Sequence, residues 1–340
     1  MSKVLIIKLA AIGDVIMALP MVEKIKKEYP GAEITWVAGK TVAPILEQFP
    51  IQHLIKVDES KLFKGTLLEK IGTVLGLWQK LSLKKFDLIV IGHTDYRYRC
   101  ITLFTRGMKR YFIKEPGKRN FPISTRHFTD EYTRLILNDD CNAKITLSAV
   151  LPNLCSGKFT DFLTKFKNRS IIAIVPGGAK NCLADDMCRR WPIDNYVQLV
   201  RLILQQGYEV VLIGADSDAW VRPYFKNLPV QDLIGKTNLL ELVEIYQHCD
   251  LVITHDSGPM HLAGLAGAKL LALFGPTNPY EKIPRGRQVI KFIWDVDQYA
   301  CCPCYDGKTY ANCQNNICLK NILPERVLEV AIKILKESKY

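Results

Sequence analysis

Two kinds of segment are absent from this sequence of 340 residues. No apolar run reaches the roughly 18 to 20 residues that a membrane-spanning helix needs, and Met1 and Lys3 lead directly into a strand-like run without the layout of a signal peptide. No strand-like run is followed by G-x-G-x-x-G, the loop that holds the pyrophosphate of a dinucleotide. We therefore expect a cytoplasmic protein, and we do not expect a nicotinamide-dependent dehydrogenase.

Acidic residues are scarce between positions 97 and 126, where Glu115 is the only acid in a chain whose formal net charge is +12. The cations of this basic stretch are Arg97, Arg99, Arg106, Lys109, Arg110, Lys114, Lys118, Arg119 and Arg126. A solvated basic loop region fits the pattern, and so does a site for phosphates on an anionic glycolipid or on nucleic acid. Because no RNA- or DNA-binding signature accompanies the stretch, we do not expect a nucleic-acid partner.

Short apolar, β-branched runs alternate with helical patterns, which is typical of parallel α/β layers. With 48% apolar and 24% charged residues, a chain of this length suits a globular protein of two domains. The predicted strands span residues 4–8, 34–38, 54–57, 86–92, 170–175, 209–213, 251–254 and 270–274. The predicted helices span residues 15–29, 129–137, 195–206, 239–248, 258–267 and 324–336, and residues 105–128 are expected to be loops over a sheet edge.

The predicted fold class is α/β, with two doubly wound, Rossmann-like domains facing a cleft. Residues 1–160 would form the first domain and residues 168–322 the second, with a linker within residues 152–168. The final helix, in residues 323–340, has no partner in the second set of elements, so we expect it to pack back on the first domain. Ligands of such sheets bind outside the carboxyl ends of the strands, where loops 10–14, 176–180, 214–218 and 256–261 follow.

The strongest local motif joins a strand to a helix at Asp256, Ser257 and Gly258. Backbone N–H groups, a hydroxyl and the positive end of a helix dipole converge there, with His261 on the first helical turn, and this arrangement suits a diphosphate. An ordinary N-cap by Asp256 or Ser257 beside a packed histidine is the alternative. Asp218 also follows a strand and is placed either to bind ribose hydroxyls or to cap a turn.

A second motif begins where a strand opens into Pro176, Gly177 and Gly178. Glycines allow a ligand to approach the backbone closely, and Lys180 and Arg189 provide cations for phosphate oxygens. A surface loop with unpaired charge is the alternative.

The first strand is followed by a predicted tight turn at Gly13 and a helix, within IIKLAAIGDVIMALP at residues 6–20. The glycines of a phosphate loop are missing, and Asp14 stands where the helix begins. This strand–turn–helix segment therefore presents a carboxylate and does not form a phosphate site.

Three stretches in this order resemble the ADP-heptose:lipopolysaccharide heptosyltransferases, glycosyltransferase family nine. They are KVLIIKLAAIGDVIMALP, PGG with RRWP, and GKTNLLELVEIYQHCDLVITHDSGPMHLAGLAGAKLLALFGPTNP. The resemblance covers about residues 3–280, with residues 60–165 poorly matched. It implies a GT-B fold that binds the acceptor mainly in the first domain and an ADP-sugar mainly in the second, and inverting transfer of a heptose to a lipopolysaccharide core or related glycan without an obligatory metal.

On the matching positions the resemblance implies that Asp14 is the general base and that Lys8 is a nearby cation. Arg189 would meet the donor diphosphate, Asp218 the ribose and Thr237 the adenine. The full set of implied donor-binding residues is Gly177, Gly178, Lys180, Arg189, Asp218, Thr237, Asp256, Ser257, Gly258 and His261, with Asp256 on the sugar. The candidate acceptor-binding residues are Lys8, Gly13, Arg97 and Arg99, and an anionic glycolipid acceptor would bring the chain to the cytoplasmic face of the membrane.

Eleven cysteines in a chain expected in the cytoplasm argue against a disulfide framework. Cys301, Cys304, Cys313 and Cys318 have the paired spacing of a tetrahedral thiolate site, for which zinc is the first candidate and iron the second. The resemblance extends here to the protein-modifying heptosyltransferases, in which extra cysteines hold iron in a short finger. Such a metal would be structural, because four thiolates leave no open position. Free thiols and disulfides are the alternatives.

Three other functions fit parts of this pattern: a transferase that uses another NDP-sugar, one with a protein acceptor, and a non-catalytic nucleotide-sugar-binding module. Asp14 discriminates against the last of these, since a binding module needs no acid at that strand end.

Overall fold

The computed structural model describes residues 1–112, 125–137, 149–154, 157–159, 164, 169–180, 185–286, 288–305 and 310–337. These residues form two compact units, the first within residues 1–137 and the second from residue 149 onward. Residues just before and inside the predicted linker already belong to the second unit: the Leu151 N–H donates to the Leu265 carbonyl at 2.9 Å, and the Leu154 N–H donates to Gln247 Oε1 at 2.8 Å. The second unit therefore begins earlier than the predicted boundary.

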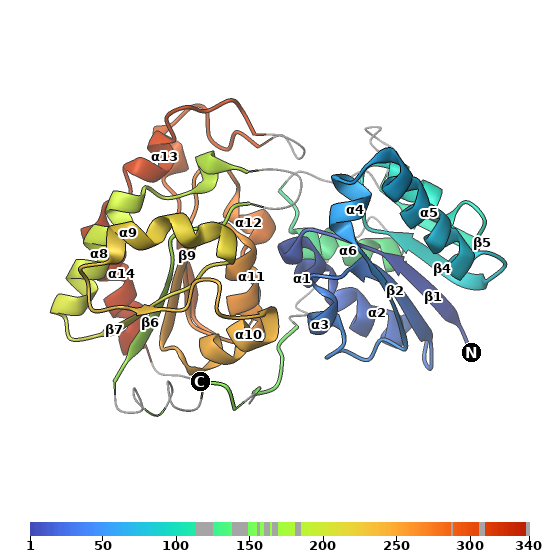
Figure 1. Ribbon diagram of the computed structural model, residues 1–340, viewed down its shortest axis with the longest axis horizontal. Helices are drawn as coiled ribbons and strands as arrows, with labels where there is room; N and C mark the ends of the chain where they lie inside the picture. Colours follow the sequence, from blue (N-terminus) through green and yellow to red (C-terminus); the bar gives the residue numbers. More distant parts are fainter. Residues whose placement is uncertain are drawn as a thin grey trace. The chain divides into compact units, whose positions relative to one another are not determined.

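The first unit is built on a five-stranded parallel sheet with the order β3-β2-β1-β4-β5, a doubly wound arrangement (Figure 1). Its elements are β1 (Lys3–Ile7), α1 (Ile12–Ala18), α2 (Pro20–Glu28), β2 (Glu33–Gly39), α3 (Ala43–Leu46), β3 (His53–Val57), α4 (Glu59–Phe63), α5 (Leu67–Leu81), β4 (Lys85–Ile91), η1 (Tyr96–Thr102), β5 (Arg106–Tyr111) and α6 (Phe128–Leu137). The strand order reverses between β1 and β4, so ligands are expected beyond the carboxyl ends of these two strands.

The helix after β1 differs from its prediction in two ways. It begins at Ile12, with Ala11 as the N-cap residue, so Gly13 lies buried inside the first turn and the predicted tight turn at Gly13 is wrong. It also ends at Ala18, and α2 starts at Pro20, because proline cannot donate a backbone hydrogen bond and sits best at the first position of a helix. The predicted single helix over residues 15–29 is thus two helices.

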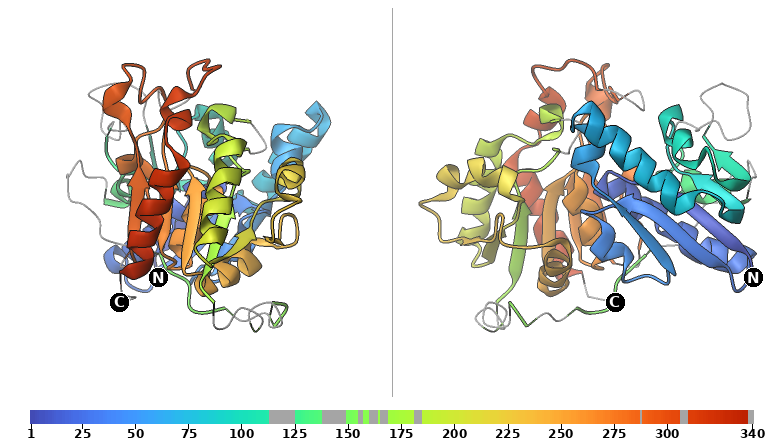
Figure 2. Two further views of the ribbon diagram at one scale, coloured as in Figure 1. Left: turned by 90° about the vertical axis from the view of Figure 1, so that its left-hand side faces the viewer. Right: turned by 45° about the vertical axis from the view of Figure 1, so that its right-hand side comes forward.

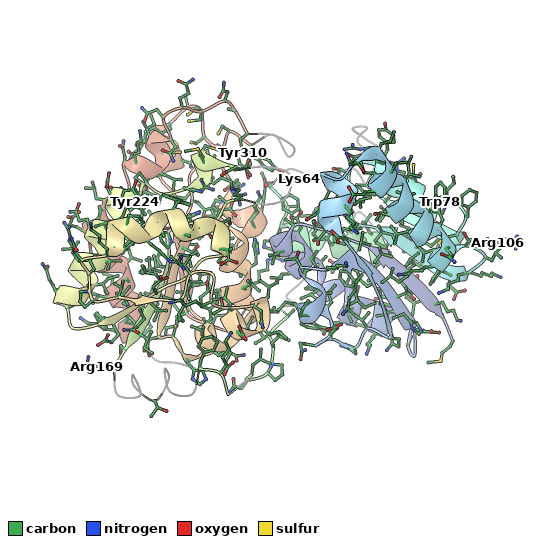
Figure 3. All side chains as sticks on the ribbon, viewed as in Figure 1. Lys64, Trp78, Arg106, Arg169, Tyr224 and Tyr310 are labelled. Atoms are coloured by element: carbon green, nitrogen blue, oxygen red, sulfur yellow. The ribbon has the colours of Figure 1, made fainter. Side chains whose placement is uncertain are left out.

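The edge strand β5 was missed by the sequence analysis, which predicted loops over residues 105–128. Its sequence, RGMKRY, carries charges and little apolar alternation, as exposed edge strands often do. The neighbouring helix α5 is fixed to the 3-10 helix η1, because Trp78 Nε1 donates to the Cys100 carbonyl at 2.7 Å. Trp78 and Arg106 mark this edge of the unit in Figure 3.

The second unit contains a six-stranded parallel sheet with the order β11-β10-β9-β6-β7-β8, and the strand order reverses between β6 and β9. Its elements are β6 (Ile171–Val175), η2 (Met187–Arg189), α8 (Ile193–Gln205), β7 (Glu209–Leu212), η3 (Asp216–Val221), α9 (Arg222–Phe225), β8 (Gln231–Asp232), α10 (Leu239–His248), β9 (Leu251–His255), α11 (Gly258–Leu265), β10 (Leu270–Leu273), α12 (Pro279–Lys282), β11 (Ile290–Ile293), η4 (Val296–Gln298), α13 (Ile317–Lys320) and α14 (Pro324–Lys336). All predicted strands and helices of this region are present, with ends shifted by one or two residues.

The final helix α14 packs on α8 within the second unit, so the expectation that it returns to the first domain is wrong (Figure 2). Val327, Ala331 and Ile334 recur at helical spacing and are buried with α8 and one face of the sheet. The Lys269 ammonium donates to the Ile334 carbonyl at 3.0 Å and so satisfies the last turn of α14.

Among the described residues, no helix combines the length and the apolar composition that crossing a membrane would require.

Candidate active site

In the first unit, Lys8 and Asp14 form an ion pair beyond the carboxyl end of β1. Lys8 directly follows the strand, Asp14 lies in the first turn of α1, and Lys8 Nζ is 3.2 Å from Asp14 Oδ2. The Lys8 side chain is 4% exposed, whereas that of Asp14 is 39% exposed. The predicted base and its cation are therefore together, and the carboxylate is the accessible member.

The buried Lys8 side chain is held on several sides. Burial lowers the pKa of Lys8, and the charge of Asp14 opposes part of that shift. Lys8 Nζ lies 5.1 Å from the centroid of the Tyr132 ring, and the Lys8 carbonyl accepts a hydrogen bond from Trp36 Nε1 at 3.0 Å. The Lys8 ammonium is therefore a cation fixed beside the Asp14 carboxylate.

His93, just beyond the carboxyl end of β4, is a site residue that the sequence analysis missed. Its Nε2 accepts a hydrogen bond from the Leu9 N–H at 3.1 Å, and its ring stacks on Tyr98 with centroids 3.6 Å apart. Burial, followed by the charge of Lys8, lowers the pKa of His93 well below its ordinary value. A histidine directly after a buried strand at the reversal point of the sheet was the available signal.

The basic stretch is largely used for internal contacts. Arg97 pairs with Asp95 at 2.6 Å but stays exposed, while Arg99 donates to the Phe112 carbonyl at 3.2 Å. Among the other cations of the stretch, Lys109 donates to a carbonyl at the end of η1, Arg110 to carbonyls in the last turn of α6, and Arg126 lies 3.2 Å from Glu131. Lys114, Lys118 and Arg119 lie outside the described residues. Much of the local charge therefore serves the fold, while Arg97 and Arg106 are exposed.

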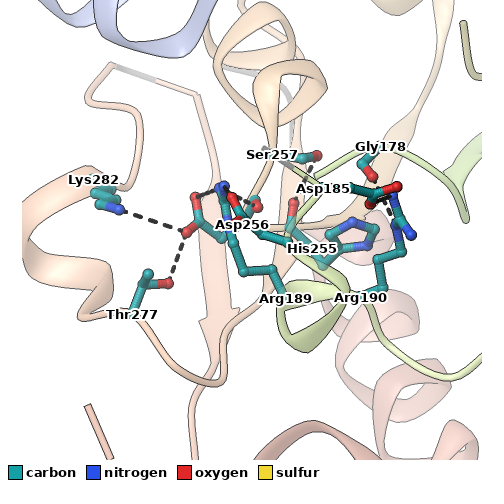
Figure 4. Close-up of polar contacts among 10 residues, drawn as sticks. Gly178, Asp185, Arg189, Arg190, His255, Asp256, Ser257, Thr277 and Lys282 are labelled. Carbon is teal, nitrogen blue, oxygen red and sulfur yellow. Dashed lines mark hydrogen bonds and ion pairs between the residues drawn. The ribbon is translucent and has the colours of Figure 1, made fainter. Parts of the chain in front are cut away.

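In the second unit, Arg189 and Asp256 meet at the reversal point between β6 and β9 (Figure 4). Arg189 Nη2 donates to the Asp256 backbone carbonyl at 2.6 Å and lies 3.2 Å from Oδ1, an ion pair without hydrogen-bond alignment. The Asp256 side chain is 3% exposed and that of Arg189 15% exposed. Here the carboxylate is the buried member of the pair.

Two residues that the sequence analysis missed complete the surroundings of Asp256. The Thr277 hydroxyl donates to Asp256 Oδ2 at 2.7 Å, and Lys282 Nζ lies 4.0 Å from the same oxygen. Burial alone would raise the pKa of the Asp256 carboxyl, but the charges of Arg189 and Lys282, with the Thr277 hydroxyl, outweigh it and hold that pKa well below its usual range. Asp256 is therefore a buried anion with two cations beside it, Arg189 and Lys282.

The loop after β6 is tied to the loop after β7 by Asp218. Asp218 Oδ1 accepts a hydrogen bond from the Gly178 N–H and Oδ2 one from the Ala215 N–H, both at 2.9 Å. A side chain at Gly177 would place its Cβ 2.5 Å from Asp218 Cγ, and Gly178 has a φ of +88°, which favours glycine. Asp218 therefore has a structural role, as the turn-capping alternative anticipated, and its contact with a ribose stays a prediction.

The helix α11 begins without the serine cap that the sequence allowed. Ser257 is the N-cap residue, but its hydroxyl donates to the His255 carbonyl at 3.1 Å instead of accepting from the helix. The first turn thus keeps its backbone donors without a side-chain cap. His261 lies in that turn, 5% exposed, and its charge helps to lower the pKa of Asp256.

His255, at the end of β9, is a further buried residue that the sequence analysis passed over. Its Nδ1 is 2.9 Å from the Tyr196 hydroxyl, while its Nε2 has no hydrogen-bond partner among the described residues. Burial, followed by the charge of Arg189, lowers the pKa of His255 to about 3, so the imidazole is neutral at physiological pH.

The remaining predicted donor residues lie at the same end of the sheet. Lys180 pairs with Asp185 at 3.7 Å, and both side chains are nearly half exposed. Thr237 precedes Asn238, the N-cap residue of α10, and is half-buried. Their contacts with a nucleotide stay predictions.

The cysteines near the C-terminus are close enough to influence one another. Within the predicted set, Cys304 lies near Cys301 and Cys313, and Cys318 lies near all three. Cys302, outside the predicted set, contacts Cys318 and Cys301, and Cys188 from η2 lies near Cys304 and Cys313. In the described part of the chain, no group of three or more His, Cys, Asp or Glu side chains is arranged to hold a metal ion. The predicted four thiolates therefore do not form a ligand set in this arrangement, and a bound metal stays a prediction.

Comparison with known proteins agrees with this fold. The sequence profile of glycosyltransferase family 9 (heptosyltransferase) matches residues 143–312, half of the chain. The chain is 27% identical over 304 residues to lipooligosaccharide heptosyltransferase 2 of Haemophilus influenzae, covering 81% of this chain and 84% of that protein.

Two solved structures share the fold along almost their whole length. The glycosyl transferase family 9 structure from Veillonella parvula has a TM-score of 0.75 at 23% identity, with 99% of this chain and 98% of that chain covered. The ADP-heptose lps heptosyltransferase II of E. coli has a TM-score of 0.72 at 21% identity, with 98% of both chains covered.

Two doubly wound units of this kind form a GT-B fold. The family match and the relatives make the chain a glycosyltransferase. The chain belongs to glycosyltransferase family 9, the heptosyltransferase family.

Proposed function

We propose that this glycosyltransferase moves a heptose from ADP-heptose to a hydroxyl group of a lipopolysaccharide core acceptor, with inversion at the anomeric carbon. The names of its relatives support the donor and the acceptor, since one is a lipooligosaccharide heptosyltransferase and another an ADP-heptose lps heptosyltransferase. The observation that carries the mechanism is the accessible Asp14 carboxylate, fixed by the buried Lys8.

Asp14 is the proposed general base. As the acceptor oxygen attacks the anomeric carbon, an Asp14 oxygen takes its proton, the bond from that carbon to the phosphate oxygen breaks, and ADP departs with the electron pair. A positioned base of this kind contributes on the order of 10² to 10⁴-fold to the rate. Gly13, in the first turn of α1, and the exposed Arg97 with Arg99 are the proposed acceptor contacts.

The second unit is proposed to hold the donor. The Arg189 guanidinium and the uncapped first turn of α11, with Ser257, Gly258 and His261, would neutralise the departing diphosphate. The other proposed donor contacts are Gly177, Gly178 and Lys180 at the phosphates, Asp218 at the ribose, Thr237 at the adenine and Asp256 at the sugar.

The deciding experiment is an assay of the purified protein with a panel of NDP-sugars and a defined lipopolysaccharide core acceptor. Mass spectrometry of the products should show heptose transfer from ADP-heptose, and NMR should show the inverted anomer. Faster transfer from another NDP-sugar, or transfer only to a protein hydroxyl, would replace this function with one of those alternatives. Binding of ADP-heptose without transfer or hydrolysis would indicate a non-catalytic nucleotide-sugar-binding module.

No metal is needed in the proposed step, because protein cations face the diphosphate. Addition of EDTA should therefore leave the initial transfer rate unchanged, and a rate restored only by Mg²⁺ would contradict this. Elemental analysis of the same preparation tests the cysteine prediction separately, and less than about a tenth of an equivalent of zinc or iron would remove the four-thiolate site.

We also propose that the protein meets its glycolipid acceptor by peripheral contact with the membrane, through exposed cations such as Arg97. Co-sedimentation with vesicles that contain the acceptor, weakened in Arg97→Gln, would support this contact.

A further inference from the structure

Tyr305 and Tyr310 belong to the cysteine-rich segment that runs from Cys301 to Cys318. Their rings lie over Lys282 and Arg189, the two cations beside Asp256. Tyr305 and Tyr310 form an isolated antiparallel bridge, and their ring centroids are 4.6 Å apart at an interplanar angle of 31°. Lys282 Nζ lies 4.3 Å from the centroid of the Tyr305 ring, and the Arg189 guanidinium lies 5.6 Å from that of Tyr310. Each ring therefore covers one cation within cation–π distance.

The backbone fixes this tyrosine pair to the site. The Cys304 N–H donates to the Pro276 carbonyl at 3.0 Å, next to Thr277, and the Ala311 N–H donates to the Cys304 carbonyl at 3.2 Å. The segment that carries the pair is thus anchored to the strand end from which Thr277 contacts Asp256.

The contacts of Lys282 include Asp256 and the Tyr305 ring. At 4.0 Å its ammonium is at the outer limit of an ion pair with Asp256 Oδ2, an oxygen that already accepts the Thr277 hydroxyl. The side chain is 11% exposed, so the ammonium has lost most of its water. An ammonium placed in this way gains most from a multiply charged anion, since charge-assisted hydrogen bonds are strong where water is excluded.

We propose that Lys282 is a second cation for the donor diphosphate, and that Tyr305 and Tyr310 are positioning residues that hold Lys282 and Arg189 on the two sides of Asp256. This inference rests on the proposed function, because the anion in question is the diphosphate of ADP-heptose. It gives the cysteine-rich segment a role in donor binding.

Titration calorimetry with ADP and with adenosine tests Lys282. Lys282→Gln should weaken ADP binding by about ten- to a hundredfold, the scale of a charge-assisted hydrogen bond, and leave adenosine binding within about twofold. Lys282→Arg should keep most of the ADP affinity. Equal losses for ADP and adenosine would show general damage to the site and overturn the assignment.

The tyrosine pair is tested by comparing aliphatic with aromatic replacements. Tyr305→Leu and Tyr310→Leu should each weaken ADP binding by about two- to thirtyfold, because they remove a cation–π contact. Tyr305→Phe and Tyr310→Phe should restore it, because the ring face and not the hydroxyl makes the contact. Failure of the phenylalanine variants to restore affinity would overturn the positioning role.

Tyr224→Leu is the matched control, because Tyr224 lies on α9 and packs against Trp220, away from Tyr310 (Figure 3). Thermal unfolding of every variant reports on folding. Wild-type protein that binds ADP and transfers heptose, together with unchanged ADP affinity in Lys282→Gln and in both leucine variants, would refute this inference and leave the proposed function intact. Wild-type protein that binds no ADP would refute the proposed function itself.

Discussion

The two units each pair an aspartate with a cation at the reversal point of a parallel sheet, but they bury opposite members of the pair. In the first unit the Lys8 side chain is 4% exposed and that of Asp14 39%; in the second the Asp256 side chain is 3% exposed and that of Arg189 15%. The first pair therefore offers a carboxylate to its surroundings, and the second offers cations.

The difference in which member is buried assigns different chemistry to the two aspartate–cation pairs. A carboxylate that is accessible, yet held by a buried cation, can take a proton, which is the task of a general base. Cations gathered around a buried carboxylate are preorganised for negative charge, which is the requirement of a diphosphate leaving group. The account therefore predicts that substitutions in the first pair reduce turnover and that substitutions in the second reduce donor affinity.

The largest effect is expected for Asp14→Asn, which keeps the shape of the side chain and removes its basicity. Turnover should fall by at least about a hundredfold, since a general base contributes on the order of 10² to 10⁴-fold. Initial rates at saturating donor and acceptor measure it. Asp87→Asn, which changes an exposed carboxylate on β4 that accepts from the Lys3 N–H, is the control and should keep the wild-type rate.

For Arg189→Ala, we expect weaker ADP binding by roughly 1 to 3 kcal/mol, the scale of a lost charge-assisted hydrogen bond. Calorimetry measures the dissociation constant. Arg169→Ala removes a surface arginine that pairs with Glu209 and should leave ADP binding unchanged. Unchanged affinity in the Arg189 variant would remove that residue from the diphosphate site.

Gly177→Ala tests whether the loop after β6 depends on close packing against Asp218. The new Cβ would lie 2.5 Å from Asp218 Cγ, so we expect a loss of about 1 to 3 kcal/mol of unfolding free energy from overpacking. Denaturant unfolding measures it. A Cβ at Gly72, in α5, would meet nothing within 4 Å, so Gly72→Ala should be neutral or stabilising. Equal stability of both variants would show that the loop accommodates the added methyl group without a loss of unfolding free energy.

The last prediction is a pH dependence from His255. Its pKa of about 3 in the folded protein lies below the ordinary value of 6.5, so the unfolded chain takes up a proton first and stability is lost as pH falls below 6.5. The loss is at most about 1.4 kcal/mol per pH unit. Unfolding between pH 7 and 4.5 should show a shallower decline for His255→Gln than for the wild type, and parallel curves would contradict the buried neutral imidazole.

Local sequence was enough to predict the central strands, most of the longer helices and the pair in the first unit, but the predicted helices omit α5 (Leu67–Leu81). Strand ends agreed to within a residue or two, because apolar β-branched runs bounded by turn residues leave few alternatives. Lys8 and Asp14 are close in sequence, so a strand followed by a helix already brings them together. The charged edge strand β5 was missed because its residues face solvent and show no apolar period.

The pair in the second unit depends on topology that local patterns do not contain. Arg189 and Asp256 are 67 positions apart and meet only because β6 and β9 are neighbours in the sheet. Thr277, Lys282 and Tyr310 come from segments further along the chain, and none carries a local signature of anion binding. The same limit explains α14, whose apolar stripe was visible but whose partner α8 was not.

The most direct test of this difference between the two aspartate–cation pairs is to measure turnover and the ADP dissociation constant on the same preparations of Asp14→Asn and Arg189→Ala. The account predicts that Asp14→Asn loses at least about a hundredfold in turnover with an ADP dissociation constant within twofold of wild type, while Arg189→Ala loses ADP affinity. Loss of ADP affinity in Asp14→Asn, or wild-type turnover in that variant, would contradict it.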